Sequence, residues 1–355
     1  MITLATDAAS RAAIDREIDR ALGRIAARCL ALGDGAVALG DAIARSTTGG
    51  KRFRPALVVS AFSAFGSDPA DVPALYPVAA AFELLHTAFV VHDDVIDNDT
   101  ERRGIPNVVG EFRDRGRSSG ADAAASSLVG DAAGILAGDL LLHEAERIIA
   151  LAALDPGARA LILDVIDDAV FVSVAGELAD VENAAAGDWA SPEAILNAAH
   201  DKTAVYSFTA PLRAGAILAG APPEAFPAID RFGGRLGLAF QLVDDLIGAF
   251  GSPEQAGRDA GGDLREAKRT PLVALARESA SWPLVSSALA LAHTGPIAVA
   301  EAQRMLDESG ARDGVLGLIE ETLAESRAAA RDASLPIDVR TLLLGLADAV
   351  QERIP

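Results

Sequence analysis

Hydrophobic positions recur at helical spacing along most of the chain. Between Asp7 and Leu32 they stand three or four residues apart, with charged residues between them, at Ile14, Ile18, Leu22, Ile25 and Cys29. This spacing places them on one face of an amphipathic helix. No stretch rich in alternating apolar and polar residues with hairpin turns interrupts the pattern. The pattern therefore predicts an all-α protein built as a helical bundle.

The same pattern predicts a long apolar helix from about Ala74 to Asp97, followed further on by another that ends near Asn183. Residues 105–128 are rich in Gly, Ser, Arg and Asp, and this composition predicts a mobile loop. The chain after Thr270 reads as amphipathic helix without chemically active groups. In that part the apolar residues expected to pack are Leu343, Leu346 and Val350.

Three carboxylates, Asp93, Asp94 and Asp97, crowd the end of the long apolar helix. Asp93 and Asp97 are one turn apart and share a helix face, whereas Asp94 points about 100° away. Carboxylates gathered in this way repel one another unless a positive charge lies among them. Oxygen ligands without thiolates suit Mg²⁺, which is readily shared with substrate phosphates, and Arg102 and Arg103 follow as phosphate anchors. A solvated acidic helix end is the simpler alternative.

A second aspartate pair, Asp244 and Asp245, follows another apolar run that includes Gln241. Two aspartate helices far apart in sequence are expected to face each other across one cavity and to share metal ions. The repetition favours a metal site over a solvated helix end.

Composition narrows the possible partners. The chain has 355 residues and a formal net charge of −20, which argues against a nucleic-acid surface. The single cysteine excludes an internal disulfide and fits a reducing compartment. We expect one domain over residues 1–355, no membrane-spanning segment, no signal peptide and a cytoplasmic location.

All but three of the 31 basic residues are arginines, and the exceptions are Lys51, Lys202 and Lys268. A chain that otherwise uses arginine is expected to keep lysine where a compact ammonium is required. Lys51 belongs to the run Gly-Gly-Lys-Arg-Phe-Arg-Pro, in which two glycines allow close approach of a ligand and the clustered cations, among them Arg54, call for an anion. The run predicts a phosphate site within an otherwise acidic chain.

These motifs, in this order, resemble those of the trans-type polyprenyl diphosphate synthases, and the chain looks most like bacterial geranylgeranyl diphosphate synthases. The resemblance covers nearly the whole chain. It implies a single large helical bundle around a central substrate cavity, a cytoplasmic homodimer, and condensation of isopentenyl diphosphate with an allylic diphosphate. It also implies Mg²⁺ as cofactor, with up to three ions bound alongside the allylic diphosphate.

The resemblance assigns roles to individual residues. It implies metal binding by Asp93, Asp97 and Asp244. It implies binding of the two diphosphates by Lys51, Arg54, His86, Arg102 and Arg103. It implies catalytic roles, at the developing allylic cation and the departing diphosphate, for Lys202, Thr203, Gln241 and Lys268. The segment with Gly138 and Asp139 is expected to serve helix packing.

Besides Arg258, which stands where a lysine is common, two positions depart from the family pattern. Glu177 stands where an amide is usual, and Gly248 stands where the second aspartate motif usually has its third carboxylate. Three other readings are weighed. A plain structural helical protein would leave both aspartate pairs unexplained. The other two are a class I terpene cyclase and a catalytically inert subunit that regulates a synthase. The second diphosphate pocket around Lys51 argues against the first, and the retained lysines and aspartates argue against the second.

Product length is predicted from the residues before Asp93. Phe89 lies one turn back on the same face and is expected to form the floor of the tunnel for the growing chain, next to the small Ala88. In the family that the chain resembles, aromatic residues at these two positions shorten the product, so one aromatic and one small residue imply geranylgeranyl diphosphate. Farnesyl diphosphate or a longer product is the alternative.

Overall fold

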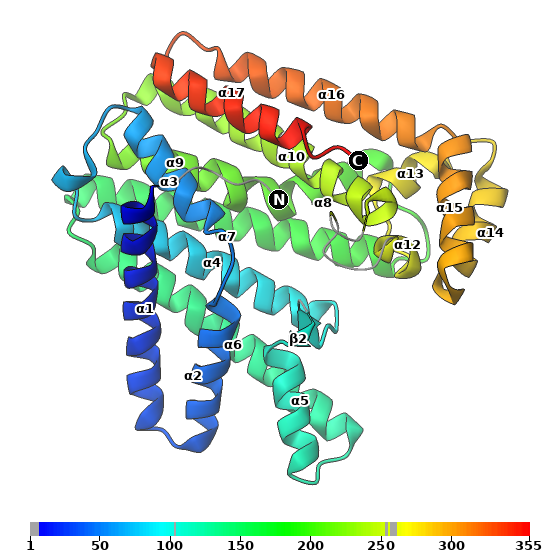
Figure 1. The fold of residues 1–355 in the computed structure, drawn as a ribbon, viewed down its shortest axis with the longest axis horizontal. Helices are drawn as coiled ribbons and strands as arrows, with labels where there is room; N and C mark the ends of the chain where they lie inside the picture. Colours follow the sequence, from blue (N-terminus) through cyan, green and yellow to red (C-terminus); the bar gives the residue numbers. More distant parts are fainter. Residues whose placement is uncertain (1–6, 103, 253–254, 256–260) are drawn as a thin grey trace. The chain divides into compact units, whose positions relative to one another are not determined.

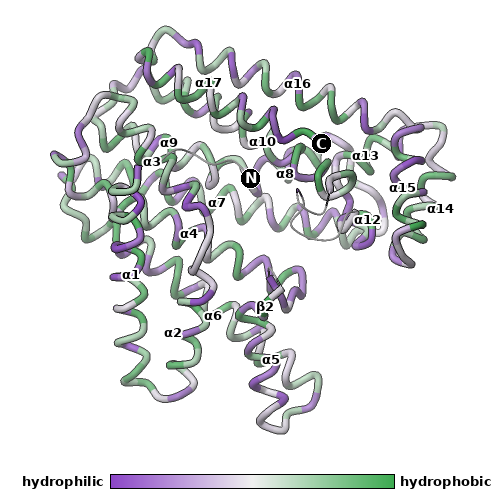
Figure 2. Tube along the Cα trace, viewed as in Figure 1, coloured by the Kyte–Doolittle hydropathy of each residue, from purple (hydrophilic) through white to green (hydrophobic). Residues whose placement is uncertain are grey.

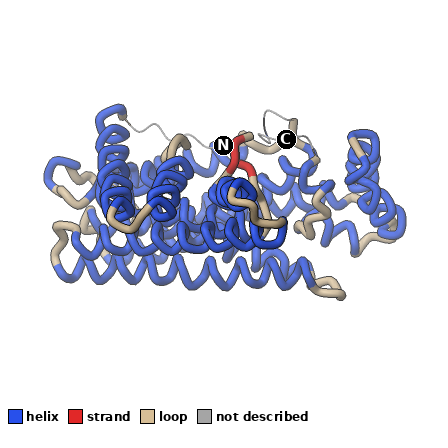
Figure 3. The backbone as a smooth tube through the Cα atoms, turned by 90° about the horizontal axis from the view of Figure 1, so that it is seen from below, coloured by secondary structure: helices blue, strands red, loops and turns tan. Residues whose placement is uncertain are grey.

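The computed structural model describes residues 7–102, 104–252, 255 and 261–355. Most of them are helical (Figure 1), and among them the only strands form one short antiparallel hairpin, drawn in red in Figure 3, that pairs Arg102 with Ile105. The all-α prediction is confirmed. The first half of the chain contains α1 Ala8–Leu30, α2 Asp34–Thr47, α3 Phe53–Ala64, η1 Pro69–Asp71, α4 Leu75–Ile96, β1 Glu101–Arg102, β2 Ile105–Pro106, α5 Val108–Ser118, α6 Ala123–Leu151 and α7 Pro156–Ala185. The second half contains α8 Pro192–Ala204, η2 Val205–Thr209, α9 Ala210–Leu218, η3 Pro223–Ala225, α10 Phe226–Phe250, α12 Gly262–Arg265, α13 Pro271–Arg277, α14 Trp282–Leu291, η4 Ala292–Thr294, α15 Pro296–Glu308, α16 Ala311–Ala330 and α17 Ile337–Gln351.

The described residues form two compact units. The N-terminal unit comprises residues 7–164 and 214–220, and the C-terminal unit comprises residues 165–213 and 221–355. The expectation of a single domain over the whole chain stays a prediction.

Helix α4 forms the centre of the N-terminal unit. It packs against α1, α3 and α6, and its core side chains, among them Phe82, Leu84 and Leu85, are almost completely buried. The predicted first helix is confirmed as α1, whose N-terminal amides bond to the Asp7 side chain. Figure 1 shows α1 beside α2. The aspartate motif at the end of α4 is thus carried by a well-packed helix.

The prediction of a mobile loop over residues 105–128 is wrong. This stretch contains the hairpin strand β2, helix α5, which the Asn107 side chain caps at Gly110 N, and the start of α6. Two of its three glycines serve close packing, because a Cβ atom at Gly116 would press against Ser126 on α6 and one at Gly110 would overlap the Thr100 carbonyl. The third, Gly120, has a φ of 87° and lies in the turn before α6. Arg113 is buried and donates to Asp131 on α6 at 2.9 Å. Glycine occurs at close helix contacts as well as in turns, and this stretch contains both.

Helix α10 occupies the centre of the C-terminal unit and packs against α8, α16 and α17. Along α16 and α17 hydrophobic and hydrophilic residues are interspersed (Figure 2), as expected for helices with one face toward a core. Leu343, Leu346 and Val350 are buried, so their predicted packing role is confirmed. The second aspartate motif lies near the end of α10.

Two helices, α4 and α6, are long and apolar enough to cross a membrane by length and composition. The most apolar part of α4 is 67% buried within the protein, as in the core helix of a folded domain, and that of α6 is 39% buried. Helix α6 carries exposed apolar side chains at Leu128, Val129, Ile135, Leu136 and Leu140.

Candidate active site

The first aspartate motif closes helix α4. The Asp97 amide donates to the Asp93 carbonyl at 2.8 Å, so the helical spacing that places the two residues on one face is retained at the helix end. Asp97 is exposed and Asp93 is partly exposed, whereas Asp94 is buried. As predicted, Asp94 thus points away from the shared face. Asp93 and Asp97 offer carboxylate oxygens accessible from outside the core.

Asp94 has a role that the sequence analysis missed. Arg102 donates to its Oδ1 atom from Nη2 at 2.6 Å and from Nε at 3.1 Å, while Arg102 Nη2 lies 3.9 Å from Asp93 Oδ2. Burial raises the pKa of the Asp94 carboxyl, and the hydrogen bonds from Arg102 oppose that rise. The buried carboxylate therefore fixes the predicted phosphate anchor beside Asp93. Arg103, the second predicted anchor, lies outside the described residues.

The glycine-rich basic run is organised by its second cation. Arg52 adopts a left-handed conformation, with φ at 52°, and donates to Glu83 Oε1 and Asp15 Oδ1, each at 2.9 Å. Gly49 and Gly50 also have positive φ, a conformation in which glycine is least strained. Arg52 thus anchors the run to α1 and α4, while Lys51 is exposed.

The remaining predicted residues of the N-terminal unit lie on α3 and α4. Arg54, in the first turn of α3, and His86 on α4 are both partly exposed. Phe89 is partly exposed and Ala88 is fully buried, so of the two only Phe89 presents accessible surface. Asp139, expected to be structural, lies beside His92, and a Cβ atom at the preceding Gly138 would overlap the His92 ring.

In the C-terminal unit, Lys202 is held by two carboxylates of α7. Its Nζ atom lies 3.0 Å from Glu177 Oε2 and 3.2 Å from Asp180 Oδ2. Glu177, the departure from the family pattern, thus forms an ion pair with a predicted catalytic cation. Asp180 did not stand out in the sequence. Lys202 lies in the last turn of α8, next to the π-helical turn Val205–Thr209, an irregularity that is frequent at functional sites.

Gly176 brings the α8 backbone at Lys202 against α7. A Cβ atom at residue 176 would overlap the backbone nitrogen of Lys202 and the carbonyl carbon of Asp201. We therefore expect Gly176→Ala to destabilise the protein by about 1–3 kcal/mol, the usual effect of overpacking a tight contact. Chemical denaturation measures this loss. Gly187→Ala is the control, because a Cβ atom there has open space around it. An equal loss in both variants would contradict the role of Gly176 in the contact between α7 and α8.

A chain of hydrogen bonds links the next turn of the site. Thr203 Oγ1 donates to Gln241 Oε1 at 2.9 Å, and Gln241 Nε2 donates to Asp245 Oδ1 at 2.9 Å. The sequence placed Thr203 and Gln241 at one reacting centre, and the structure brings them into direct contact. Burial raises the pKa of the Asp245 carboxyl to about 8, the Gln241 hydrogen bond opposing the rise and the nearby Asp263 and Asp244 adding to it.

This pKa predicts a pH dependence of stability. Because the folded-state pKa of Asp245 lies above the ordinary value of 3.8, the folded chain binds a proton that the unfolded chain releases, and stability falls as pH rises from about 4 to about 8. Asp245→Asn removes this loss. The variant's gain in melting temperature over wild type, measured with chelator present, is expected to be larger at about pH 9 than at about pH 5. Asp139→Asn is the exposed control; a gain independent of pH would refute the expectation.

Asp244 provides the accessible carboxylate of the second aspartate motif, on α10. Arg353, which follows α17, donates to its Oδ1 atom, and the Arg353 guanidinium stacks 4.4 Å from the centre of the Phe240 ring. The sequence showed no chemical pattern after Thr270, and this contact places Arg353, from that part of the chain, beside Asp244. The contact joins residues 109 positions apart, which no local pattern reveals.

Gly248, the other departure from the family pattern, lies against Asp263. A Cβ atom at residue 248 would overlap the Asp263 carboxylate, which is buried. Lys268, a predicted catalytic residue, lies with Nζ 3.4 Å from Glu266 Oε2 and 3.9 Å from Asp263 Oδ1. Asp263 thus occupies the space beside α10 that a side chain at residue 248 would need.

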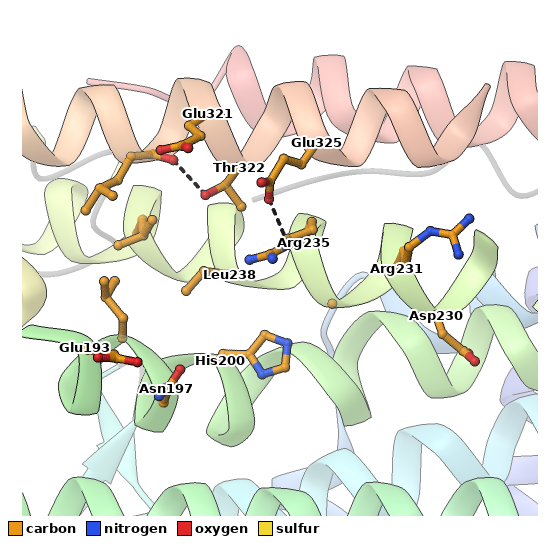
Figure 4. Close-up of a pocket in the computed structure, with 14 residues that line it drawn as sticks. Glu193, Asn197, His200, Asp230, Arg231, Arg235, Leu238, Glu321, Thr322 and Glu325 are labelled. Carbon is orange, nitrogen blue, oxygen red and sulfur yellow. Dashed lines mark hydrogen bonds and ion pairs between the residues drawn. The ribbon is translucent and has the colours of Figure 1, made fainter. Parts of the chain in front are cut away.

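A separate pocket of the C-terminal unit lies between α8, α10 and α16. Figure 4 shows its polar lining, with His200 and Asn197 on α8 and an ion pair of 2.8 Å between Arg235 on α10 and Glu325 on α16. None of the predicted site residues is among those that line it. The pocket is therefore distinct from the candidate active-site residues.

The donor set fits magnesium. Among the described residues, no group of three or more His, Cys, Asp or Glu side chains is arranged to hold a metal ion by itself. The accessible carboxylates come instead from Asp93 with Asp97 on α4 and from Asp244 on α10. Mg²⁺ is commonly held by one or two carboxylates and completes its coordination shell with water and substrate phosphate. The small number of accessible carboxylates agrees with this mode of binding.

Comparison with known proteins identifies the family. The model of the polyprenyl synthetase family matches residues 38–302. A short chain isoprenyl diphosphate synthase of Methanothermobacter thermautotrophicus is 31% identical over 310 residues, 86% of this chain and 87% of that protein. A (2E,6E)-farnesyl diphosphate synthase of Mycobacterium bovis is 38% identical over 221 residues, 62% of this chain and 55% of that protein.

Among solved structures, the geranylgeranyl pyrophosphate synthase of Corynebacterium glutamicum, complexed with isoprenyl diphosphate and magnesium, is 29% identical. The similarity covers 99% of this chain and 100% of that one, with a TM-score of 0.88. Both the family model and the first relative span most of the chain. The chain therefore belongs to the polyprenyl synthetase family and is an enzyme of the prenyltransferase class.

Proposed function

We propose that the chain condenses isopentenyl diphosphate with an allylic diphosphate in a Mg²⁺-dependent reaction and releases pyrophosphate. The observation that carries this proposal is that one accessible aspartate in each of the two motifs, Asp93 and Asp244, has an arginine beside it. Arg102 lies 3.9 Å from Asp93, and Arg353 contacts Asp244. Carboxylates bind the cation and guanidinium groups bind phosphate, so the pairing suits diphosphates that arrive with metal.

Asp93 and Asp97 of the N-terminal unit and Asp244 of the C-terminal unit would hold Mg²⁺, which would supply charge that stabilises the departing diphosphate. In the reaction the allylic carbon–oxygen bond breaks, the isopentenyl double bond attacks the allylic carbon, and a proton lost from the new chain passes to pyrophosphate. Lys202, held by Glu177 and Asp180, contributes fixed positive charge for the leaving group.

The other residues bind or orient. Thr203 and Gln241, joined by their hydrogen bond, present oxygen atoms toward the allylic cation. Arg102 and Lys268 bind the allylic diphosphate, and isopentenyl diphosphate is bound by Lys51, Arg54, His86 and Arg103. Preorganised groups of this kind stabilise developing charge without reorganising during the reaction.

The test is turnover of radiolabelled isopentenyl diphosphate with an allylic primer, in the presence and absence of Mg²⁺. A linear prenyl diphosphate that forms only with the metal supports the proposal. A cyclised hydrocarbon would point to a terpene cyclase. No product with any primer, although the chain is folded, would point to an inert regulatory subunit.

We propose geranylgeranyl diphosphate as the product. The support is the partly exposed Phe89, one turn before Asp93, beside the buried Ala88. An aromatic side chain one helical turn before Asp93 is expected to stop the growing apolar chain at intermediate length.

Phe89→Ala tests the assignment of product length. If Phe89 forms the tunnel floor, products become longer, while the first condensation survives because the diphosphates bind elsewhere. Chromatography of dephosphorylated products after reaction with isopentenyl diphosphate measures the shift. The control is Val90→Ala, the neighbouring residue on another helix face. An unchanged product from Phe89→Ala would exclude Phe89 as the determinant.

We also propose that the enzyme is a homodimer in a reducing, cytoplasmic setting. The exposed apolar side chains of α6, among them Leu136 at 54% exposure, offer a surface that a second copy would cover. Sedimentation of the full chain tests the oligomeric state. A monomer at micromolar concentration would contradict the proposal.

A further inference from the structure

Arg353 occupies an unusual position for a residue outside every recognised motif. It lies directly after α17, where its amide donates to the Val350 carbonyl at 3.1 Å, so the turn that carries it is fixed to the helix. Figure 1 shows α17 beside α10, the helix of the second aspartate motif. Only 13% of the Arg353 side chain is exposed. The fold thus directs a long cationic side chain from α17 onto α10.

Two contacts hold the guanidinium there. Nη2 donates to Asp244 Oδ1, and the planar group stacks on Phe240, whose ring lies 5.2 Å from that of the buried Phe208. Stacking on an aromatic ring holds an arginine without using its N–H groups. The Phe240 contact therefore keeps Arg353 at the site even when Asp244 binds another cation.

Two nitrogen atoms of the guanidinium can donate further hydrogen bonds. Its Nε and Nη1 atoms are buried and have no hydrogen-bond partner among the residues that the structure describes. Buried donors without acceptors are destabilising, more so when charged. The planar fork of arginine matches two oxygens of a phosphate group. An incoming diphosphate would supply the acceptors that these N–H groups need.

We propose that Arg353 is a further substrate-binding residue beside the second aspartate motif. Its guanidinium changes its hydrogen-bond partner from the Asp244 carboxylate to a diphosphate group when substrate binds. Before substrate arrives, Arg353 neutralises the Asp244 carboxylate. When Asp244 binds the metal that accompanies the diphosphate, Arg353 stays stacked on Phe240 and donates to diphosphate oxygens. This inference rests on the proposed function, because it presumes that Asp244 is a metal ligand.

If the proposal is correct, Arg353→Ala changes the affinity for the metal ion and the affinity for pyrophosphate in opposite directions. Without diphosphate, Arg353 competes with the cation for Asp244, so Arg353→Ala is expected to bind Mn²⁺ severalfold more tightly. With diphosphate, the variant lacks a charged hydrogen-bond donor, so its affinity for pyrophosphate in the presence of Mg²⁺ is expected to fall about tenfold. Simple loss of packing would weaken both.

The experiment measures Mn²⁺ binding to the full chain by electron paramagnetic resonance, and pyrophosphate binding with Mg²⁺ by calorimetry. Arg353→Lys keeps the charge without the fork, so Mn²⁺ affinity is expected to stay near wild type while pyrophosphate affinity falls. The matched control is Arg327→Ala, which removes an arginine that binds Asp348 and Gln351 of α17 and leaves Asp244 untouched. It is expected to change neither affinity.

Two results would overturn the inference. One is an Arg353→Ala protein that matches the Arg327→Ala control in both measurements, and the other is a change of both affinities in the same direction. If the wild-type chain itself binds neither Mn²⁺ nor pyrophosphate with Mg²⁺, the proposed function fails. The failure of the inference and that of the function are therefore distinguishable.

Discussion

Asp93→Ala is expected to lower the turnover rate at ordinary Mg²⁺ concentration by about 10²- to 10³-fold, the range found when one preorganised electrostatic group is removed from an active site. The fold should persist, because the Asp93 side chain is 31% exposed and lies at the end of α4, outside the core. Steady-state kinetics against Mg²⁺ concentration measure the loss, and thermal unfolding checks the fold.

Asp139→Ala is the matched control, an aspartate on α6 whose side chain is 62% exposed. It is expected to retain the wild-type rate. Asp94→Ala is expected to reduce the rate less than Asp93→Ala, since Asp94 acts through Arg102. Its signature is a raised KM for the allylic diphosphate. Full activity of Asp93→Ala at ordinary Mg²⁺ would remove the metal assignment of the first aspartate motif.

Lys202→Arg is expected to lower kcat by about a hundredfold although the charge is kept. A loss of this size is typical when a group at the reacting centre is misplaced by about 1 Å. The ammonium contacts Glu177 and Asp180 at 3.0 to 3.2 Å, and the backbone at residue 202 lies directly against Gly176. A longer planar guanidinium in this confined position cannot keep the same contacts. Single-turnover kinetics separate the chemical step from product release.

Arg269→Lys serves as the control for exchanging one cation for the other. Arg269 belongs to the same unit and donates to the Asn183 carbonyl at 2.7 Å, a contact that an ammonium can also make. It is expected to lower the rate far less than Lys202→Arg. A near-native rate for Lys202→Arg would show that the three lysines of this arginine-rich chain were not kept for their compact charge.

The sequence by itself determined the helices and the identity of the chemical groups. Helix positions follow from the spacing of apolar residues, which is a local property. The helices α1, α4 and α17, and the residues on the buried face of each, were therefore predictable. The i, i+4 relation of Asp93 and Asp97 is equally local. Residues 105–128 were misread because glycine favours both turns and close helix contacts, and only packing distinguishes them.

Only the tertiary structure decided which charged group pairs with which. Arg102 binds Asp94 more closely than Asp93, Lys202 binds Glu177, and Arg353 reaches Asp244 across 109 residues. Helical periodicity relates residues that are one or two turns apart. Partners brought together by the packing of separate helices have no such period, because their distance depends on how whole helices cross and on where small residues such as Gly176 permit contact.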